Sequence, residues 1–137
     1  PARPRAYIET YGCQMNVADT EMMLGQLAAA GFTRTHEPDG ADVILINTCA
    51  VREKAEERVF GRLANLAAQK RRGRRVVLGI TGCMAEHLKE SIAERVPDVD
   101  LVVGPDAYRR LVEHVERARG GGDAIVDTAL DRYETYE

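Results

Sequence analysis

Short apolar runs alternate along the chain with longer stretches in which apolar residues recur every three or four positions. The apolar runs predict strands, and two of them are almost continuously hydrophobic, as strands covered on both faces are. The predicted strands are 5–9, 42–46, 76–81 and 101–104, with a shorter edge piece at 32–35. The helical spacing predicts helices with one buried face over 19–30, 52–71, 85–96 and 107–119.

Strand and helix therefore alternate, which predicts a parallel sheet with right-handed crossovers. We expect a three-layer α/β fold in which a parallel five-stranded sheet, of flavodoxin-like order 2-1-3-4-5, carries helices on both faces. Residues 1–5 are expected to be disordered and residues 6–119 to form the domain. Three glycines at 120–122 form a flexible break, so 120–137 is expected to be a linker toward a further domain, with a short β-like run at 124–126.

The three cysteines each follow a predicted strand and precede a predicted helix. They are Cys13, Cys49 and Cys83, separated by similar intervals of about one βα unit plus the next strand. In the expected order the strands before them are neighbours, about 4.8 Å apart. Open parallel sheets bind ligands at the carboxyl ends of their strands. The sequence therefore predicts one three-cysteine site at that edge.

Three thiols beside helix N-termini suit a metal or an anionic metal cluster. Four cysteines complete an iron–sulfur cluster or a structural zinc site, so three leave one coordination position open for chemistry. Zinc with a water as fourth ligand is an alternative, although His36, His87 and His114 lie outside the cysteine motifs. The cysteines could also be small core residues.

Several residues beside the cysteines fit the same site. Gly12 and Gly82 each precede a cysteine and would let the backbone approach a bulky cluster or take a positive φ, with ordinary turn formation as the alternative. Asn16, Asn47 and Thr48 can donate hydrogen bonds to sulfide or thiolate, or can instead cap the strand–helix junctions.

Composition narrows the class of protein. A net charge of −3 gives no global reason to bind nucleic acid, and the basic run at 70–75 suits either a solvated helix end or an RNA contact. No apolar run approaches the roughly 20 residues that span a bilayer. An odd number of cysteines argues against a secreted disulfide framework and for a reducing compartment, so we expect a cytoplasmic protein.

Three blocks around the cysteines resemble the N-terminal domain of the radical S-adenosylmethionine methylthiotransferase family, of the MiaB type that modifies tRNA. The blocks are Tyr11-Gly12-Cys13-Gln14-Met15-Asn16, Asn47-Thr48-Cys49-Ala50-Val51-Arg52-Glu53-Lys54-Ala55 and Gly82-Cys83-Met84-Ala85. The resemblance implies that Cys13, Cys49 and Cys83 hold an auxiliary [4Fe–4S] cluster. Its open iron would take up the sulfur or methylthio group for transfer.

By the same resemblance the chain is a fragment of a tRNA-modifying transferase, inactive alone. The full enzyme would carry a second [4Fe–4S] cluster and S-adenosylmethionine, and would add a methylthio group to C2 of N6-isopentenyladenosine beside the anticodon. Its partner would be tRNA, its sulfur donor is unidentified, and the fragment is expected to be a monomer or weak dimer. Other branches modify threonylcarbamoyl-adenosine in tRNA or a ribosomal protein aspartate, but the residues after Cys13 and Cys49 resemble the isopentenyl-adenosine branch more closely.

Two other classes of protein are alternatives to the enzyme. The cysteines could form a non-catalytic iron–sulfur or thiol sensor in an interaction module. A phosphate-responsive or flavin-binding module is less consistent with the sequence, because the first loop after a strand lacks the paired acids of a receiver and the Ser/Thr-rich phosphate loop of a flavodoxin.

Overall fold

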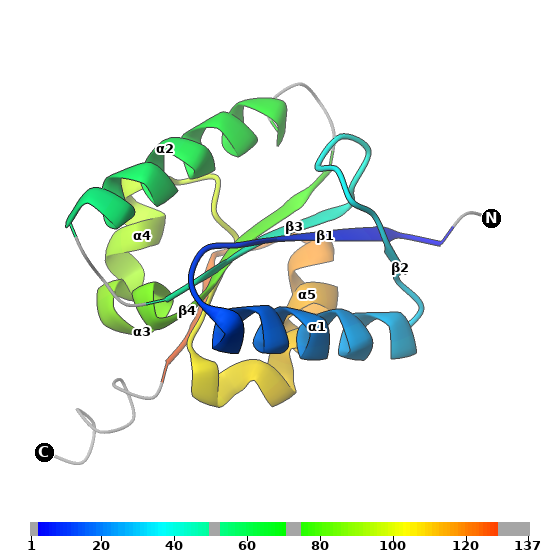
Figure 1. Ribbon diagram of the computed structural model, residues 1–137. Helices are drawn as coiled ribbons and strands as arrows, with labels where there is room; N and C mark the ends of the chain where they lie inside the picture. Colours follow the sequence, from blue (N-terminus) through cyan, green and yellow to red (C-terminus); the bar gives the residue numbers. More distant parts are fainter. Residues whose placement is uncertain (1–2, 50–52, 71–74, 129–137) are drawn as a thin grey trace, which may run out of the picture.

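The computed structural model describes residues 3–49, 53–70 and 75–128, and in them one parallel sheet lies between two layers of helices (Figure 1). The sheet has six strands in the order β2-β1-β3-β4-β5-β6. The strands are β1 (Arg5–Thr10), β2 (Thr33–Arg34), β3 (Val43–Thr48), β4 (Val77–Gly82), β5 (Leu101–Val103) and β6 (Ile125–Asp127). The predicted three-layer α/β fold is confirmed, with one strand more than expected.

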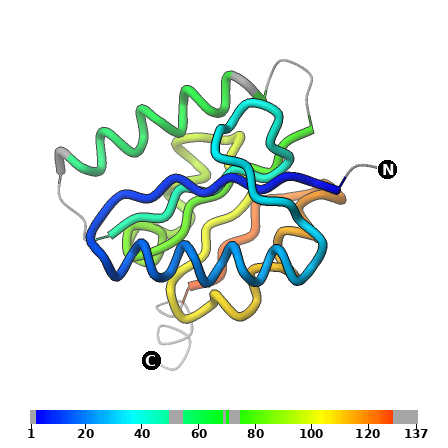
Figure 2. Tube along the Cα trace, turned by 45° about the vertical axis from the view of Figure 1, so that its right-hand side comes forward, coloured from blue at the N-terminus to red at the C-terminus, as the bar shows by residue number. Residues whose placement is uncertain are grey.

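Helices cover both faces of this sheet, as the chain trace shows (Figure 2). They are α1 (Gln14–Ala29), α2 (Glu53–Lys70), α3 (Cys83–Leu88), α4 (Glu90–Arg95), the 3-10 helix η1 (Pro105–Arg110) and α5 (Leu111–Arg119). One face packs against α2, α3 and α4, and the other against α1, η1 and α5. None of the helices within the described residues is long and apolar enough to cross a membrane.

The central strands account for this sandwich because their side chains alternate between two apolar layers. Every residue of β3 and β4 is buried. Ile44 and Ile46 join the layer beneath α2, while Val43 and Leu45 join the layer beneath α1. Continuously apolar strands are expected where helices cover both faces of a parallel sheet.

Three predicted helices differ from the structure in their bounds or continuity. The helix predicted to begin at 19 begins at Gln14, with Cys13 as its N-cap residue. The helix predicted over 85–96 is two short helices, because Lys89 takes a positive φ of 50° between them. The helix predicted over 107–119 begins with the 3-10 turn of η1 before α5.

The additional strand β6 comes from the short run noted at 124–126. It pairs in parallel with β5, and the amide of Gly104 donates to the carbonyl of Asp127 at 2.9 Å. The Asp127 carboxylate binds the guanidinium of Arg110 at 2.7 and 3.1 Å and lies 2.7 Å from His114 Nε2. At the other end of the chain Arg5 already lies in β1, opposite Thr33. Residues 129–137 of the predicted linker and residues 1–2 lie outside the described residues.

The Asp127 carboxylate is expected to stabilise the fold at neutral pH. Hydrogen bonds from Arg110 lower its pKa from 3.8 to about 2, against the opposing effect of burial and with help from His114. A lowered folded-state pKa gives stability that is present above the unfolded pKa and is lost as pH falls from about 4 toward 2. In Asp127→Asn, we expect a loss of about 1–2 kcal/mol at pH 7 and a flatter acid unfolding profile, followed by circular dichroism. An unchanged acid profile would contradict this role.

Candidate functional site

All three cysteines lie at the carboxyl ends of adjacent strands. Cys13 follows β1 as the N-cap of α1, Cys49 directly follows β3, and Cys83 begins α3 after β4. The strands β1, β3 and β4 are neighbours in the sheet, and β3 lies between the other two. The three thiols are free, with Cys13 and Cys83 exposed and Cys49 partly exposed. The structure thus brings the predicted cysteines to one edge of the sheet.

Two glycines let the outer cysteine loops approach the end of β3. Gly12 has a φ of 141°, and a Cβ placed on it would lie 2.7 Å from the Cβ of Cys49. Gly82 has a φ of 96°, and its Cβ would lie 2.1 Å from the carbonyl oxygen of Thr48. Figure 2 shows the loop after β1 beside the end of β3. The expected positive φ is present at both glycines, and their close neighbours are protein atoms, so an approach to a bound cluster stays a prediction.

Asn47 joins three elements beneath the cysteines. It is fully buried, and its amide nitrogen donates to the carbonyl of Asn16 at 2.9 Å and to the hydroxyl of Thr20 at 3.0 Å. Its amide oxygen accepts from the hydroxyls of Thr81 at 3.1 Å and Tyr108 at 3.3 Å. Both amide hydrogens are therefore used within the protein, and Asn47 braces β3 against α1, β4 and η1.

Asn16 and Thr48 complete this buried polar network. The Asn16 amide nitrogen donates to the carbonyl of Thr48 at 2.9 Å, while its oxygen accepts from the Cys13 amide at 3.2 Å and faces Cys13 Sγ at 3.5 Å. The Thr48 hydroxyl donates to the carbonyl of Thr81 at 2.7 Å and accepts from the Met84 amide at 3.2 Å. The predicted polar residues therefore hold the cysteine loops, and a contact with bound sulfur stays a prediction.

Tyr108 is a site residue that the sequence analysis missed. Its ring is buried on η1, and its hydroxyl donates to Asn47 within reach of the charges of Asp19 and Cys83. Burial, reinforced by Asp19, raises its pKa above the ordinary value, so the phenol stays protonated and keeps donating. No motif marks Tyr108, because its role depends on the contact between η1 and Asn47 of β3.

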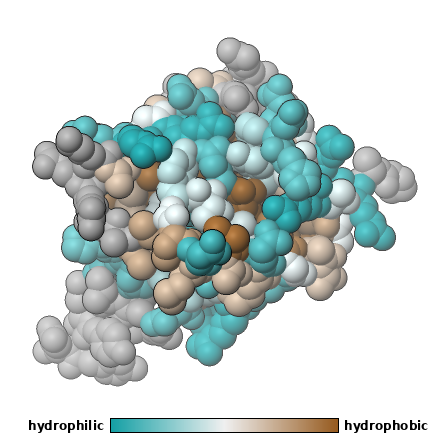
Figure 3. All heavy atoms as spheres, viewed as in Figure 1, coloured by the Kyte–Doolittle hydropathy of each residue, from teal (hydrophilic) through white to brown (hydrophobic). Residues whose placement is uncertain are grey.

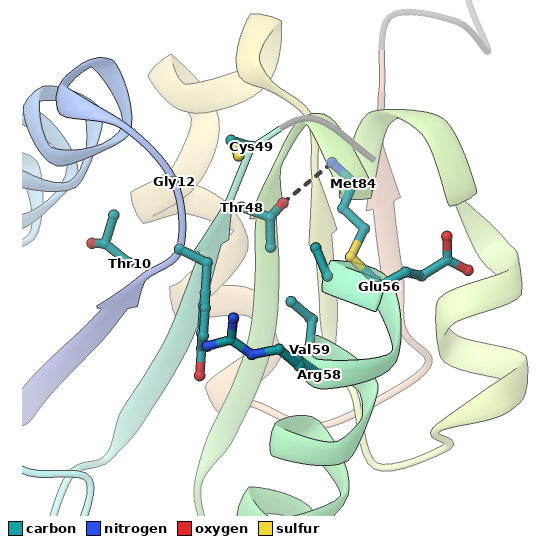
Figure 4. Close-up of a pocket in the computed structure, with 10 residues that line it drawn as sticks. Thr10, Gly12, Thr48, Cys49, Glu56, Arg58, Val59 and Met84 are labelled. Carbon is teal, nitrogen blue, oxygen red and sulfur yellow. Dashed lines mark hydrogen bonds between the residues drawn. The ribbon is translucent and has the colours of Figure 1, made fainter. Parts of the chain in front are cut away.

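A pocket of about 380 Å³ opens beside Cys49 (Figure 4). Its walls come from the ends of β1 and β3 and from the first turns of α2. The lining residues are Thr10, Tyr11, Gly12, Thr48, Cys49, Ala55, Glu56, Arg58, Val59 and Met84. The guanidinium of Arg58 lies 5.9 Å from the centre of the Tyr11 ring, which places a cation and an aromatic face next to a cysteine.

A second polar cluster, which the sequence analysis also missed, adjoins this pocket through Tyr11. The Glu9 carboxylate accepts from the hydroxyls of Tyr7 at 2.6 Å and Tyr11 at 2.5 Å. Arg62 of α2 binds the same carboxylate with two nitrogens, each at 2.9 Å from an oxygen. Burial favours the neutral acid, but these hydrogen bonds outweigh it and lower the pKa of Glu9. Burial and Glu9 together raise the pKa values of Tyr7 and Tyr11 to about 12.

Exposed apolar side chains lie on α1, the helix that begins after Cys13. Met15, Val17 and Met22 are the exposed large hydrophobic residues of the described chain, and the Met15 side chain is 77% accessible. All three lie on α1, where Figure 3 shows tan and brown atoms among hydrophilic ones. Exposed apolar side chains of α1 therefore lie near the cysteine edge, among polar ones.

Whether the thiols at this edge bind an iron–sulfur cluster or zinc stays a prediction. Within residues 3–49, 53–70 and 75–128, no three His, Cys, Asp or Glu side chains lie close enough to hold one metal ion. His114 is bound to Asp127, far along the chain from any cysteine motif. The strands that carry the three thiols are neighbours, and neighbouring strands lie about 4.8 Å apart.

Comparison with known proteins decides the family. Residues 5–104 match the family described as "Uncharacterized protein family UPF0004". The chain belongs to this family. The matched region of this UPF0004 domain contains all three cysteines, the two glycines and the Glu9 cluster, and it ends before β6.

Several curated relatives of this UPF0004 domain share a name. A protein of Amoebophilus asiaticus named "tRNA-2-methylthio-N(6)-dimethylallyladenosine synthase" is 49% identical over 130 residues, which cover 95% of this chain and 26% of that protein. A protein of the same name from Chloroherpeton thalassium is 44% identical over 134 residues, covering 98% of this chain and 30% of the relative. The chain thus spans less than a third of their length. These matches confirm the resemblance to MiaB-type proteins.

Proposed function

We propose that this domain holds the auxiliary [4Fe–4S] cluster of a tRNA methylthiotransferase on Cys13, Cys49 and Cys83. The observation that carries the proposal is the placement of these cysteines at the carboxyl ends of three neighbouring strands. The identity of 43–49% to proteins named as methylthio-adenosine synthases supports it further. A sensor module has no comparable support.

The surrounding residues suit the binding of a bulky anionic group. Gly12 and Gly82 remove side-chain atoms where the loops converge, and the Asn16, Asn47 and Thr48 network fixes the backbone around each thiol. Cys13 lies at the N-terminus of a 16-residue helix, whose dipole favours negative charge there. When bound through three thiolates, such a cluster leaves one iron free to bind the sulfur that is transferred.

The reaction of the whole protein follows from the relatives' name and the family resemblance. We propose that it adds a methylthio group to C2 of an N6-dimethylallyladenosine (isopentenyladenosine) in tRNA. Radical formation from S-adenosylmethionine requires a second cluster that this chain does not contain, because all three of its cysteines lie at the sheet edge. This domain would present sulfur, and the rest of the enzyme would activate the carbon.

A product assay tests the substrate class. The full-length enzyme, reconstituted with iron and sulfide, is incubated with S-adenosylmethionine, a reductant and tRNA that carries dimethylallyladenosine, and nucleosides are analysed by mass spectrometry. We expect methylthio-dimethylallyladenosine, and no methylthio product from the same tRNA without the dimethylallyl group. Modification of threonylcarbamoyl-adenosine or of a ribosomal protein aspartate instead would place the enzyme in another branch.

A further inference from the structure

We propose that Glu9 is a positioning residue of the three-cysteine site. Its carboxylate holds β1, which leads to Cys13, against α2, which follows Cys49 in the chain. The inference rests on the proposed function, since the distance that Glu9 controls matters only if the cysteines bind one cluster. Glu9 lies outside the site that motif reasoning identified, and it contacts none of the thiols in the described structure.

The first argument is the position of Glu9 on its strand. Successive strand residues point to opposite faces, so Tyr7, Glu9 and Tyr11 share the face that packs beneath α2. The side chain of Glu9 is only 17% accessible there, and Arg62 is 30% accessible. A charged pair in a mostly apolar layer costs desolvation free energy, so it is a poor source of stability. Its fixed two-point geometry can instead set how strand and helix are aligned.

The second argument is that two contacts between α2 and the β1 segment lie progressively closer to the cysteines. Arg62 binds Glu9, and one helical turn earlier Arg58 lies over the ring of Tyr11. Glu9 also accepts from the Tyr11 hydroxyl at 2.5 Å and so fixes that ring. Tyr11 directly precedes Gly12, where an added Cβ would lie 2.7 Å from the Cβ of Cys49. Both contacts therefore restrain the segment in which the loop of Cys13 approaches Cys49.

The third argument is that the same contacts shape the pocket beside Cys49. Tyr11 lines it together with Ala55, Glu56 and Arg58, and Figure 4 shows the Glu56 and Arg58 side chains extending from α2. If Glu9 loses its charge, Arg62 loses its partner and the Tyr11 ring is less restrained. The spacing of Cys13 and Cys49 is then less well defined, which alters the environment of a cluster without removing a ligand.

The test uses this chain, reconstituted anaerobically with iron and sulfide, in four variants. Glu9→Gln removes the charge that binds Arg62, and Tyr11→Phe removes the hydroxyl that donates to Glu9 next to the Cys13 loop. Tyr7→Phe removes the equivalent hydroxyl from the other side of Glu9, and Glu94→Gln removes an exposed acid on α4. Iron content, the midpoint potential, the EPR spectrum of the reduced cluster and the rate of iron loss to a chelator are measured, with far-UV circular dichroism to report the fold.

We expect Glu9→Gln and Tyr11→Phe to bind iron but to show a shifted midpoint potential, an altered EPR spectrum and at least tenfold faster iron loss. Glu94→Gln should match the wild type, and Tyr7→Phe, which keeps the Arg62 and Tyr11 bonds to Glu9, should change these properties less than Tyr11→Phe does. If Glu9→Gln fails to fold, Tyr11→Phe decides the question. Wild-type behaviour of Glu9→Gln and Tyr11→Phe would overturn the positioning role while leaving the proposed function intact, whereas a wild-type chain that binds no cluster would contradict the proposed function itself.

Discussion

On the proposed function, replacing Cys49 by alanine is expected to abolish methylthiolation by the full-length enzyme while leaving its cleavage of S-adenosylmethionine intact. Cys49 follows β3, the middle of the three strands that carry cysteines, so its thiol lies between the other two loops. Loss of the middle ligand leaves two thiolates on strands that are not neighbours, which is too few to retain a four-iron cluster. We expect methylthiolated nucleoside to fall at least a hundredfold, as measured by mass spectrometry, with 5′-deoxyadenosine formation as the parallel readout.

The matched control for this variant is Met15→Ala, which changes an exposed apolar side chain two residues from Cys13. It should retain a bound cluster, because Met15 contributes no ligand. Wild-type amounts of product in Cys49→Ala would show that the three cysteines are not a sulfur-transfer site. Loss of S-adenosylmethionine cleavage in that variant would instead show that the substitution had disrupted the folding of the whole enzyme.

Substituting Gly82 by alanine is expected to destabilise the domain by at least about 3 kcal/mol, since backbone strain and a steric clash act together. The φ of 96° is unfavourable for any residue with a Cβ. The added carbon would lie 2.1 Å from the carbonyl oxygen of Thr48 and 2.9 Å from its amide nitrogen, both part of buried β3. Backbone in a central strand cannot move away as the tip of a flexible side chain can, so β4 and Cys83 must shift. Denaturant unfolding followed by circular dichroism measures the change.

Gly25→Ala provides the opposite result in the same experiment. Gly25 is exposed within α1, and a Cβ there would meet no atom within 4 Å. Alanine is favoured over glycine inside a helix by about 1 kcal/mol. A Gly82→Ala domain as stable as wild type, beside a stabilised Gly25→Ala domain, would contradict the close packing inferred at the cysteine edge.

Periodicity predicted the strands of this fold well because each central strand is apolar enough to stand out from its surroundings. The order of the sheet was predictable for the same reason, since short crossovers and right-handed connections leave few topologies for alternating strands and helices. The three cysteines were located correctly at neighbouring strand ends, because their position after each strand is visible in the sequence. Their chemistry remained a matter of family resemblance.

The residues that sequence reasoning missed depend on contacts between distant elements. Glu9 is an ordinary polar residue in the pattern of β1, and only the packing of α2 shows that Arg62 binds it. Tyr108 likewise gains its role from η1, at a position the pattern predicts only as helix. The break at Lys89 was hidden because apolar positions continue in helical spacing on both sides of it. The hydrophobic pattern of a segment predicts which of its faces is buried. It does not predict which side chains form hydrogen bonds on that face.

Metal analysis of this chain after anaerobic reconstitution tests the central claim most directly. The purified domain is incubated with iron and sulfide, freed of excess reagents, and assayed for iron, sulfide and the EPR signal of the reduced state, beside Cys13→Ala, Cys49→Ala and Cys83→Ala. We predict about four irons and four sulfides per chain in the wild type, with the signal lost in each variant. Zinc in place of iron, or a cluster that survives the loss of any one of these cysteines, would contradict the account.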